Sequence, residues 1–488
     1  MRSRLLLVSP PVLHAARWWG NGDANKPHLD SLAGYVRDLA DVRILEMDRI
    51  AGEADASALD DLLAEPVGLV GISCWTSMHY LGARDVARRV RSLAPHVPIV
   101  VGGHHATAVP EDFPSELCDW VVRGDGERPL RALCQEWPGR PDERQILSGG
   151  VFDQSDPRHI DWDHYGRRSD RGLWVGLSRG CPFQCRFCVE PQRGVTSSRY
   201  SVEDALSIVE RLATIHSPRV IAFSDPLFGA SRRWTEAFLD GLERRDLPLM
   251  FWAETRADLM TPELLERFRR CRFKLDFGLD AASVAMVERM EKSPDAARYL
   301  ARSRDLLRTA NAIGLPHGVY LIFNFPGETP ATSRQAQAFI DEIGHTDGGM
   351  SGWLSAQTFF ILPGTSAFLK MREHAAAYGT KIRSPRWWAE EGDQYAGPPT
   401  CCRAGRGGGM RISSARSRAG TSGSTPRGWR AIRPRSRRSV ARSTRGRARS
   451  RSERACSGPG ALESRRDASA ETSRRPPWTA WGAAWRRR

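Results

Sequence analysis

The stretch that decides the fold is Ser178-Arg-Gly-Cys-Pro-Phe-Gln-Cys-Arg-Phe-Cys188, with Cys181, Cys185 and Cys188 in a CxxxCxxC spacing. It directly follows the apolar run 173–177, which predicts a short strand. Three thiolates on one loop can surround a metal centre, but they are one ligand short of the four cysteines of an ordinary iron–sulfur cluster. The next cysteine is Cys271 and the next histidine is His216, so no nearby residue supplies the fourth. We therefore predict a cluster with one position open to an exogenous ligand, with a zinc knuckle or a reactive thiol group as alternatives.

This loop resembles the cluster loop of the radical S-adenosylmethionine (SAM) enzymes. In that family three cysteines hold three irons of a 4Fe-4S cluster, and SAM chelates the fourth iron through its amino and carboxylate groups. The resemblance implies that Phe187, just before the last cysteine, lies beside the adenine. It also implies a partial (β/α)6 TIM-type barrel, and six strand-then-helix patterns in residues 171–370 are consistent with that fold.

Polar residues follow the predicted barrel strands at positions where members of this family contact SAM. The resemblance implies that Ser224 and Asp225 meet the amino group of SAM, and that Glu254 and Arg256 meet its carboxylate or ribose. Asp280 stands where many members carry the acid of a Gly-x-Glu motif. Taken singly, each of these residues could equally be a helix cap or a turn residue. Their joint order along the chain favours the SAM site.

Residues 1–140 alternate between strand-like and helix-like patterns, which is typical of a doubly wound, Rossmann-like α/β domain. Ligands of such sheets bind beyond the carboxyl ends of the strands. The region resembles the cobalamin-binding domain that precedes the barrel in many radical SAM enzymes. The resemblance implies a cofactor site made of Ser73, Thr76, Ser77, Gly102, Gly103, His104, Gly124 and Glu127. The Asp-x-His-x-x-Gly motif that ligates cobalt in other cobalamin proteins is absent, so a Rossmann-like domain that has lost its cofactor stays as the alternative.

The remaining segments differ in composition. Residues 141–170 are polar and rich in turn formers, which predicts a linker, and residues 371–400 read as the start of a C-terminal substrate-covering region. Residues 401–488 hold 24 arginines, no lysine and four acids, which gives this segment a net charge of +20. The whole chain has a net charge of +15, so residues 1–400 carry −5. Residues 1–400 are therefore mildly acidic. We predict a disordered Arg-rich tail and interpret it as a GC-rich gene read out of frame, with an arginine-rich arm for nucleic acid as the alternative.

These patterns lead to one functional hypothesis. We expect a cobalamin-dependent radical SAM enzyme that methylates an unactivated carbon of a secondary-metabolite precursor, through a 5′-deoxyadenosyl radical and methylcobalamin. Non-methylating radical chemistry, such as cyclisation or ring contraction, is the first alternative, and a nucleic-acid-binding protein with a structural metal is the second. The expected partners are a small-molecule or peptide substrate and a reductant such as flavodoxin or ferredoxin, without nucleic acid or membrane. Scattered cysteines, and apolar runs far below about 20 residues, predict a soluble cytoplasmic protein.

Overall fold

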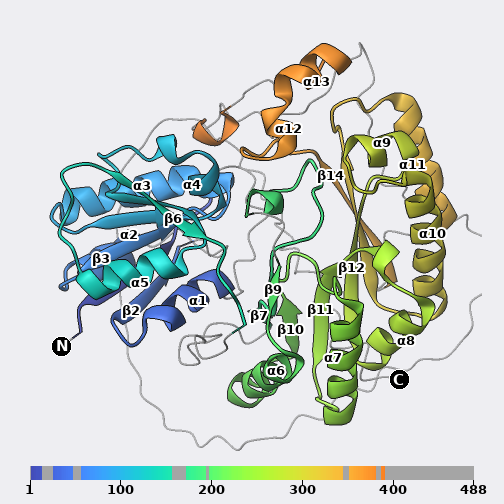
Figure 1. Cartoon of the computed structure of the whole chain (residues 1–488), viewed down its shortest axis with the longest axis horizontal. Coiled ribbons are helices and arrows are strands. Elements are labelled where there is room, and N and C mark those ends of the chain that lie inside the picture. The colour runs from blue at the N-terminus through green and yellow to red at the C-terminus, as the bar shows by residue number, and fades with distance from the viewer. Residues whose placement is uncertain are drawn as a thin grey trace, which may run out of the picture. The chain divides into compact units, whose positions relative to one another are not determined.

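The computed structural model describes residues 2–13, 26–47, 56–155, 172–193, 197–343, 351–380 and 386–390. The predicted tail, 401–488, lies outside the described residues, and so does the end of the expected covering region. Within the described ranges, no helix has the length and apolar character needed to span a bilayer. Two six-stranded sheets organise this part of the chain (Figure 1).

The first sheet is entirely parallel. Its order is β2 (Asp41–Glu46), β1 (Arg4–Ser9), β3 (Leu69–Ser73), β4 (Ile99–Gly102), β5 (Trp120–Gly124) and β6 (Gln145–Gly150). The helices between the strands are α1 (Pro27–Val36), α2 (Ala56–Leu63), α3 (Tyr80–Leu93), α4 (His104–Ala108) and α5 (Glu127–Glu136), with short 3-10 turns at Ser77–His79 (η2) and Pro110–Asp112 (η3).

Alternation along the strands explains why helices cover both faces of this sheet. On β1, Leu5 and Leu7 belong to the core beneath α1 and α5, whereas Leu6 and Val8 belong to the core that includes α3. Strand residues buried on both faces are typical of doubly wound sheets, and the predicted fold is confirmed. Because β1 lies between β2 and β3, the order reverses beside β1, and the binding crevice of such a sheet opens at the carboxyl ends there.

The segment that we expected to be a linker contributes the last strand of this sheet. Residues 145–150 form β6, which pairs with β5 from Trp120↔Gln145 to Gly124↔Gly150. The Ser-Gly-Gly sequence at 148–150 suggested a turn, but here the glycines permit close packing. A Cβ on Gly149 would lie 1.7 Å from the carbonyl oxygen of Asp125. The remaining part of the expected linker, from residue 156, lies outside the described residues.

The second sheet is also parallel. Its order is β14 (Ser351–Thr358), β13 (His317–Phe323), β12 (Phe273–Asp280), β11 (Met250–Thr255), β10 (Val220–Phe223) and β7 (Leu173–Val175). The helices are α6 (Val202–His216), α7 (Arg232–Arg245), α8 (Pro262–Arg270), α9 (Val284–Arg289), α10 (Ala296–Ala312) and α11 (Pro330–Ile343). Six parallel strands joined through helices confirm the predicted partial barrel.

One face of this second sheet packs against its helices. Phe223, Phe251 and Phe273 stack on one another on that face, and Phe238 of α7 and Phe268 of α8 pack edge-on against them. The five rings are almost completely buried. We call the opposite face of the sheet the inner face. Because strand residues alternate, the positions between these phenylalanines point to the inner face.

A short C-terminal segment ties the two sheets together after α12 (Ser366–Leu369) and α13 (Met371–Tyr378). In the turn η7 (Trp387–Ala389), the indole of Trp387 donates to the carbonyl of Ile361 at 2.9 Å. The indole of Trp388 donates to a carboxylate oxygen of Asp112, in the first domain, at 2.7 Å. Both tryptophans are almost fully buried. This segment therefore packs between elements of the first domain and the end of the second sheet.

Candidate active site

The loop that carries the three cysteines is held from several directions. It begins in β8 (Ser178–Arg179), which pairs antiparallel with β9 (Ser198–Arg199). The amide of Arg186 donates to the carbonyl of Met290 at 2.9 Å, and the carbonyl of Arg186 accepts from the amide of Ala367 at 2.9 Å. Contacts from two separate barrel segments thus fix the loop between its second and third cysteines.

The environment of the thiols suits metal-bound thiolates better than free thiols. Burial raises the pKa of Cys181, Cys185 and Cys188, for Cys188 to about 12, so without a metal they stay protonated. The charges of Lys292 and Arg256 oppose this effect at Cys181 and Cys185. The three thiols would be deprotonated when they hold iron, and the two cations would then balance part of the negative charge of the thiolates.

The three cysteines are not placed to share one small ion. Among the described residues, no group of three His, Cys, Asp or Glu side chains is arranged to hold a single metal ion. A mononuclear zinc knuckle requires such a tight set of ligands. The cysteines of a 4Fe-4S cluster instead bind different irons, so their sulfurs lie farther apart. The preference for a cluster over zinc therefore rests on the three-cysteine spacing without a nearby fourth ligand.

Two cations from the barrel reach the cysteine loop. The guanidinium of Arg256, just after β11, lies 3.9 Å from the ring centre of Phe183, between the first two cysteines. Its Nη1 atom is buried and has no hydrogen-bond partner among the described residues. Lys292 lies 5.9 Å from the ring centre of Phe187 and pairs with Asp280. A buried, unsatisfied guanidinium nitrogen suits an anionic ligand such as the carboxylate of SAM.

The residues expected to meet SAM have different environments in the structure. Asp225 accepts hydrogen bonds from the amide of Leu177 at 2.8 Å and the hydroxyl of Ser178 at 2.5 Å, so it fixes the start of the cysteine loop. Ser224 beside it is exposed. Asp280 ends β12 with a φ of 60°, next to a register shift in the pairing with β13. Backbone strain of this kind is common at functional sites.

Glu254 reaches solvent on the inner face, but the surrounding side chains crowd its carboxylate and disfavour the ionised form. Desolvation, followed by the charge of Asp276, raises its pKa from 4.5 to about 7, although Lys274 and the hydroxyl of Tyr320 act in the opposite direction. A pKa raised by folding means that folding becomes less favourable as the pH rises from about 4.5 to about 7. We expect Glu254→Gln to raise the midpoint temperature of thermal unfolding at pH 8 and to change it much less at pH 5. Scanning calorimetry at both pH values tests this, and a lower midpoint at pH 8 would contradict it.

The expected cobalamin residues gather at the carboxyl ends of β3, β4 and β5. Gly103 has a φ of 111°, and a Cβ there would lie 2.4 Å from the carbonyl oxygen of Cys74, so only glycine fits between these two loops. The hydroxyl of Ser77 contacts His105 Nδ1 at 2.9 Å, and the hydroxyl of Thr76 contacts His79 Nδ1 at 2.9 Å. These bonds fix the loop after β3. Among the other expected residues, Ser73 is buried, and Gly102 and Gly124 end their strands.

Gly103→Ala should disturb this edge. The added methyl group meets backbone rather than a movable side chain, and φ is positive, so we expect a loss of about 1–3 kcal/mol in unfolding free energy. Retention of cobalamin should fall with it. Gly139→Ala is the matched control, because nothing lies within 4 Å of a Cβ at that position. Urea unfolding and the cobalamin absorbance after gel filtration measure both effects, and equal behaviour of the two variants would refute the prediction.

Sequence reasoning missed an aromatic surface at the same edge. Trp75 lies two residues after the end of β3 and is 48% exposed, which is unusual for so large an apolar side chain. The ring of His28 stacks on it with centroids 5.6 Å apart. Burial, together with the charges of Lys26 and neighbouring histidines, lowers the pKa of His28 to about 3, so this histidine is neutral. An exposed, rigid indole next to a glycine loop suits a large flat ligand such as a corrin ring. The signal in the sequence was a tryptophan just after a buried strand.

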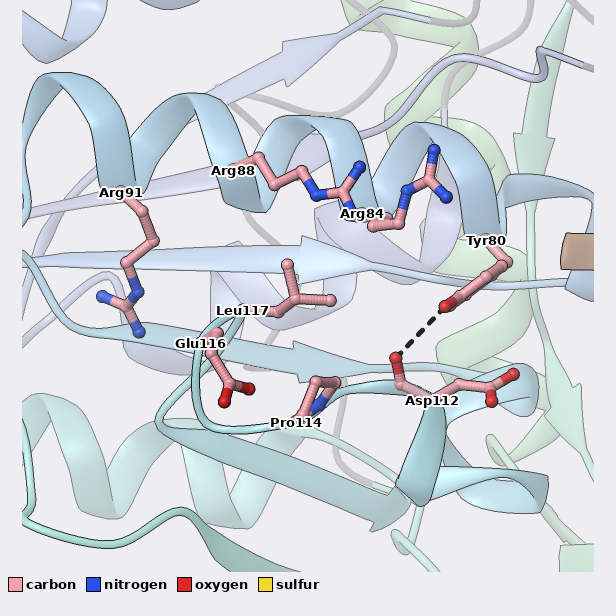
Figure 2. Close-up of a pocket in the computed structure, with 8 residues that line it drawn as sticks. All are labelled: Tyr80, Arg84, Arg88, Arg91, Asp112, Pro114, Glu116 and Leu117. Carbon is pink, nitrogen blue, oxygen red and sulfur yellow. Dashed lines mark hydrogen bonds between the residues drawn. The ribbon is translucent and has the colours of Figure 1, made fainter. Parts of the chain in front are cut away.

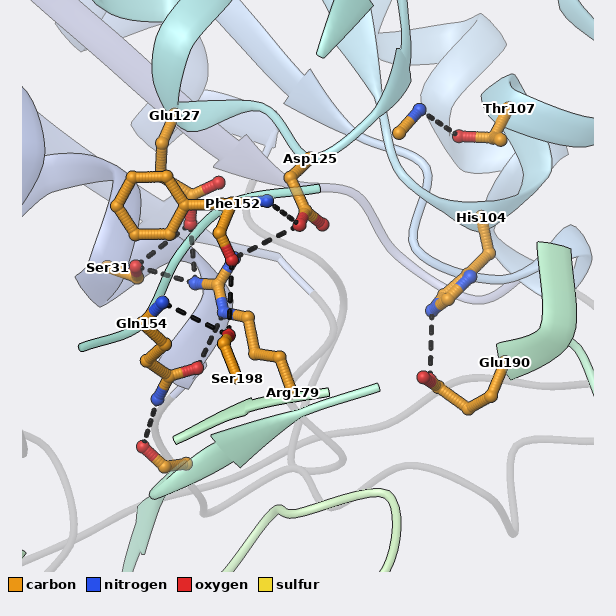
Figure 3. A network of polar contacts seen from close by, with 12 residues as sticks. Ser31, His104, Thr107, Asp125, Glu127, Phe152, Gln154, Arg179, Glu190 and Ser198 are labelled. Carbon is orange, nitrogen blue, oxygen red and sulfur yellow. Dashed lines mark hydrogen bonds and ion pairs between the residues drawn. The ribbon is translucent and has the colours of Figure 1, made fainter. Parts of the chain in front are cut away.

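A polar network connects this edge to the cysteine loop (Figure 3). Glu127, expected near cobalamin, is almost fully buried and forms an ion pair with Arg179 of β8. Ser31 donates to the same carboxylate at 3.0 Å, and Gln154 accepts from Arg179 at 2.8 Å. The network therefore joins the first domain to the strand that leads into the cysteines.

A second contact lies on the other side of the cysteines. His104 Nε2 lies 3.8 Å from a carboxylate oxygen of Glu190, two residues after Cys188 (Figure 3). The loop after β4 and the end of the cysteine loop are thus neighbours. The expected cobalamin edge and the expected cluster face the same region.

The fold and this site define a class of protein. A doubly wound domain with a ligand edge precedes a partial barrel whose first strand leads into a three-cysteine loop. Residues 21–134 match the family model described as B12 binding domain, and residues 175–340 match that of the radical SAM superfamily. The chain therefore belongs to the radical SAM enzymes that carry an N-terminal B12-binding domain, and it is a cobalamin-dependent radical SAM enzyme. This family implies a 4Fe-4S cluster, SAM and cobalamin as cofactors.

Several known proteins are similar to this chain. An uncharacterised methyltransferase of Pyrococcus horikoshii is 26% identical over 355 residues, which cover 67% of this chain and 75% of that protein. The hopanoid C-3 methylase of Methylococcus capsulatus is 24% identical over 262 residues, about half the length of each chain. The radical SAM methyltransferase TsrM of Kitasatospora setae, solved with cobalamin and a [4Fe-4S] cluster, has a TM-score of 0.62 at 20% identity, covering 79% of this chain and 81% of TsrM. At that identity the likeness concerns the fold alone.

Proposed function

We propose that this protein is a C-methyltransferase that transfers a methyl group to an unactivated carbon of a small-molecule or peptide substrate. The contact between His104 and Glu190 carries the proposal, because it makes the cobalamin edge a neighbour of the cysteine loop. A methyl donor and a hydrogen-abstracting centre must both reach the same carbon, so their sites must adjoin. Two of the relatives are methyltransferases by name, which supports the same function.

When bound, the cluster and SAM supply one-electron, hydrogen-abstracting chemistry, and cobalamin supplies a transferable methyl group. The residues of the chain bind and orient these groups. Cys181, Cys185 and Cys188 would hold the cluster, and the unsatisfied Nη1 of Arg256 would bind the carboxylate of SAM. Trp75 would support the corrin ring.

The ion pair between Arg179 and Glu127 keeps the two cofactor sites in a fixed relation. Both side chains are largely buried. Burial lowers the pKa of Arg179, but the charge and hydrogen bond of Glu127 raise it, and the pKa is raised overall, so the arginine stays charged. A buried, paired charge is costly to separate from its partner. The two domains are therefore held against opening at this point.

The test uses the full-length protein reconstituted anaerobically with iron, sulfide and cobalamin. SAM with a deuterated methyl group should yield S-adenosylhomocysteine as well as 5′-deoxyadenosine, and the label should appear in a product formed from an extract of the producing cell. Formation of 5′-deoxyadenosine alone, with cobalamin retained, would indicate non-methylating radical chemistry. SAM cleavage with neither cobalamin retention nor a methylated product would refute the proposal.

A further inference from the structure

A group of polar and aromatic side chains on the inner face lies outside the set that we expect to hold the cluster or cobalamin. It consists of Trp252 and Glu254 on β11, Lys274 and Asp276 on β12, and Tyr320 on β13, and we call it the inner-face group. Trp252 pairs in register with Lys274, and Glu254 with Asp276. Paired residues of parallel strands point to the same side, so these side chains share one surface.

Asp276 is the centre of the inner-face group and is fully buried. Its Oδ2 atom accepts from Lys274 Nζ at 2.5 Å, from the indole nitrogen of Trp252 at 2.8 Å and from the hydroxyl of Tyr320 at 3.4 Å. Lys274 is also buried. Burial lowers its pKa, whereas the negative charge of Asp276 raises it. The two opposite charges neutralise each other within the sheet.

Glu254 differs from Asp276, because its side chain is exposed and no lysine or arginine of the described chain forms an ion pair with it. Asp280, at the end of β12, forms an ion pair with Lys292, so the charges of these two residues also cancel. The inner face therefore carries one uncompensated carboxylate. Burial and the neighbouring Asp276 raise its pKa, while Lys274 and Tyr320 act in the opposite direction. An incoming cation would stabilise the ionised carboxylate.

Aromatic rings lie beside this carboxylate. The rings of Trp252 and Trp174 of β7 meet edge to face with centroids 5.0 Å apart, and both residues are only partly buried. Lys274 Nζ already lies 4.6 Å from the ring centre of Trp252, so this indole face accepts a cation. Aromatic faces attract ammonium groups, and a neighbouring carboxylate without an ion pair of its own adds to that attraction.

We propose that Glu254, together with the indoles of Trp252 and Trp174, binds a protonated amine of the substrate. This inference rests on the proposed function, and it assigns the substrate to compounds that carry a cationic amino group. Arg256, rather than Glu254, is the residue of this strand that contacts the cysteine loop. Charges that act on Glu254 come from the inner-face group and Asp280, whereas those that act on Arg256 include Cys185. Glu254 and Arg256 therefore have different charged neighbours, although both lie at the same strand end.

The experiment compares two probes of equal shape on the reconstituted, full-length protein. The probes are 3-phenylpropylamine, which is protonated at pH 8, and 3-phenylpropan-1-ol, which is neutral, and calorimetric titration measures binding of each. We expect the amine to bind about tenfold more tightly than the alcohol, and Glu254→Gln to abolish this preference. Glu236→Gln is the control, because Glu236 is a half-exposed carboxylate on α7 that pairs with Arg232 one turn earlier on the same helix.

Each other outcome overturns the inference. If the wild-type protein does not prefer the amine, the inner face does not recognise ammonium. If Glu254→Gln keeps the preference, or if Glu236→Gln loses it as well, the amine binds elsewhere. If Glu254→Gln weakens binding of SAM and leaves both probes unaffected, Glu254 belongs to the SAM site. None of these measurements needs methyl transfer, so the proposed function can fail while the amine site stands, and the reverse.

Discussion

Replacing Cys181, Cys185 or Cys188 by alanine will abolish both the iron–sulfur absorbance and the cleavage of SAM. Each cysteine is expected to hold a different iron, and the fourth position is reserved for SAM, so no other protein ligand can substitute. Cys271, the next cysteine along the sequence, is no substitute, because it is buried just after α8 with its thiol directed to the carbonyl of Leu239 at 3.8 Å. The loss should therefore exceed the roughly 10–100-fold that is typical when a residue behind a metal ligand is changed.

Cys271→Ala is the matched control for this prediction. It removes a thiol of similar burial but leaves the cysteine loop untouched, so iron content and SAM cleavage should stay at the wild-type level. The measurements are iron and sulfide content, the visible spectrum and the yield of 5′-deoxyadenosine after reduction with dithionite. A triple Cys→Ala variant that still cleaves SAM would show that the chemistry has another source.

The fold could be predicted because its signals are local. The apolar run 173–177 and the cysteine spacing lie within sixteen residues of one another, and every barrel strand is followed by a helix of ordinary amphipathic pattern. The same holds for the first domain, where strands buried on both faces alternate with helices. Strand β6 was missed, since its Ser-Gly-Gly end has the composition of a turn, and the two-residue strands β8 and β9 were missed because they are too short to show a pattern.

The partners of the site residues could not be predicted, because they depend on contacts between distant parts of the chain. Glu127 was expected at the cobalamin edge, but Arg179, 52 residues further on, occupies its carboxylate. Asp225 was expected beside SAM, but it holds the start of the cysteine loop, 47 and 48 residues before it. A residue type and a strand end indicate that a side chain is placed for function. They do not indicate which neighbour it binds.

Asp112 is the clearest case of a residue whose importance only the structure reveals. Its carboxylate accepts from the indole of Trp388, pairs with Arg386 and lies 3.4 Å from His105 Nε2, while its backbone carbonyl accepts from the hydroxyl of Tyr80 at 3.3 Å. It lies at the end of a surface pocket beside α3 that contains none of the expected cofactor residues (Figure 2). Burial raises the pKa of Asp112, but His105, Trp388 and Arg386 lower it by more. The pKa is therefore below its usual value, and the carboxylate is ionised.

Asp112→Ala should destabilise the protein by about 2–4 kcal/mol, because the indole nitrogen of Trp388 would be left buried without an acceptor and the ion pair with Arg386 would be lost. Asp112→Asn should cost less, since an amide oxygen can still accept from the indole but no longer offers a charge to Arg386. Glu111→Gln, at the exposed neighbouring position, should change stability by less than about 0.5 kcal/mol. Urea unfolding gives the three values, and hydrogen exchange of the backbone amides at 387–389 shows whether this segment detaches. If Asp112→Ala behaves like Glu111→Gln, the segment is held by the burial of its two indoles alone, and the carboxylate contributes nothing to joining the C-terminal segment to the first domain.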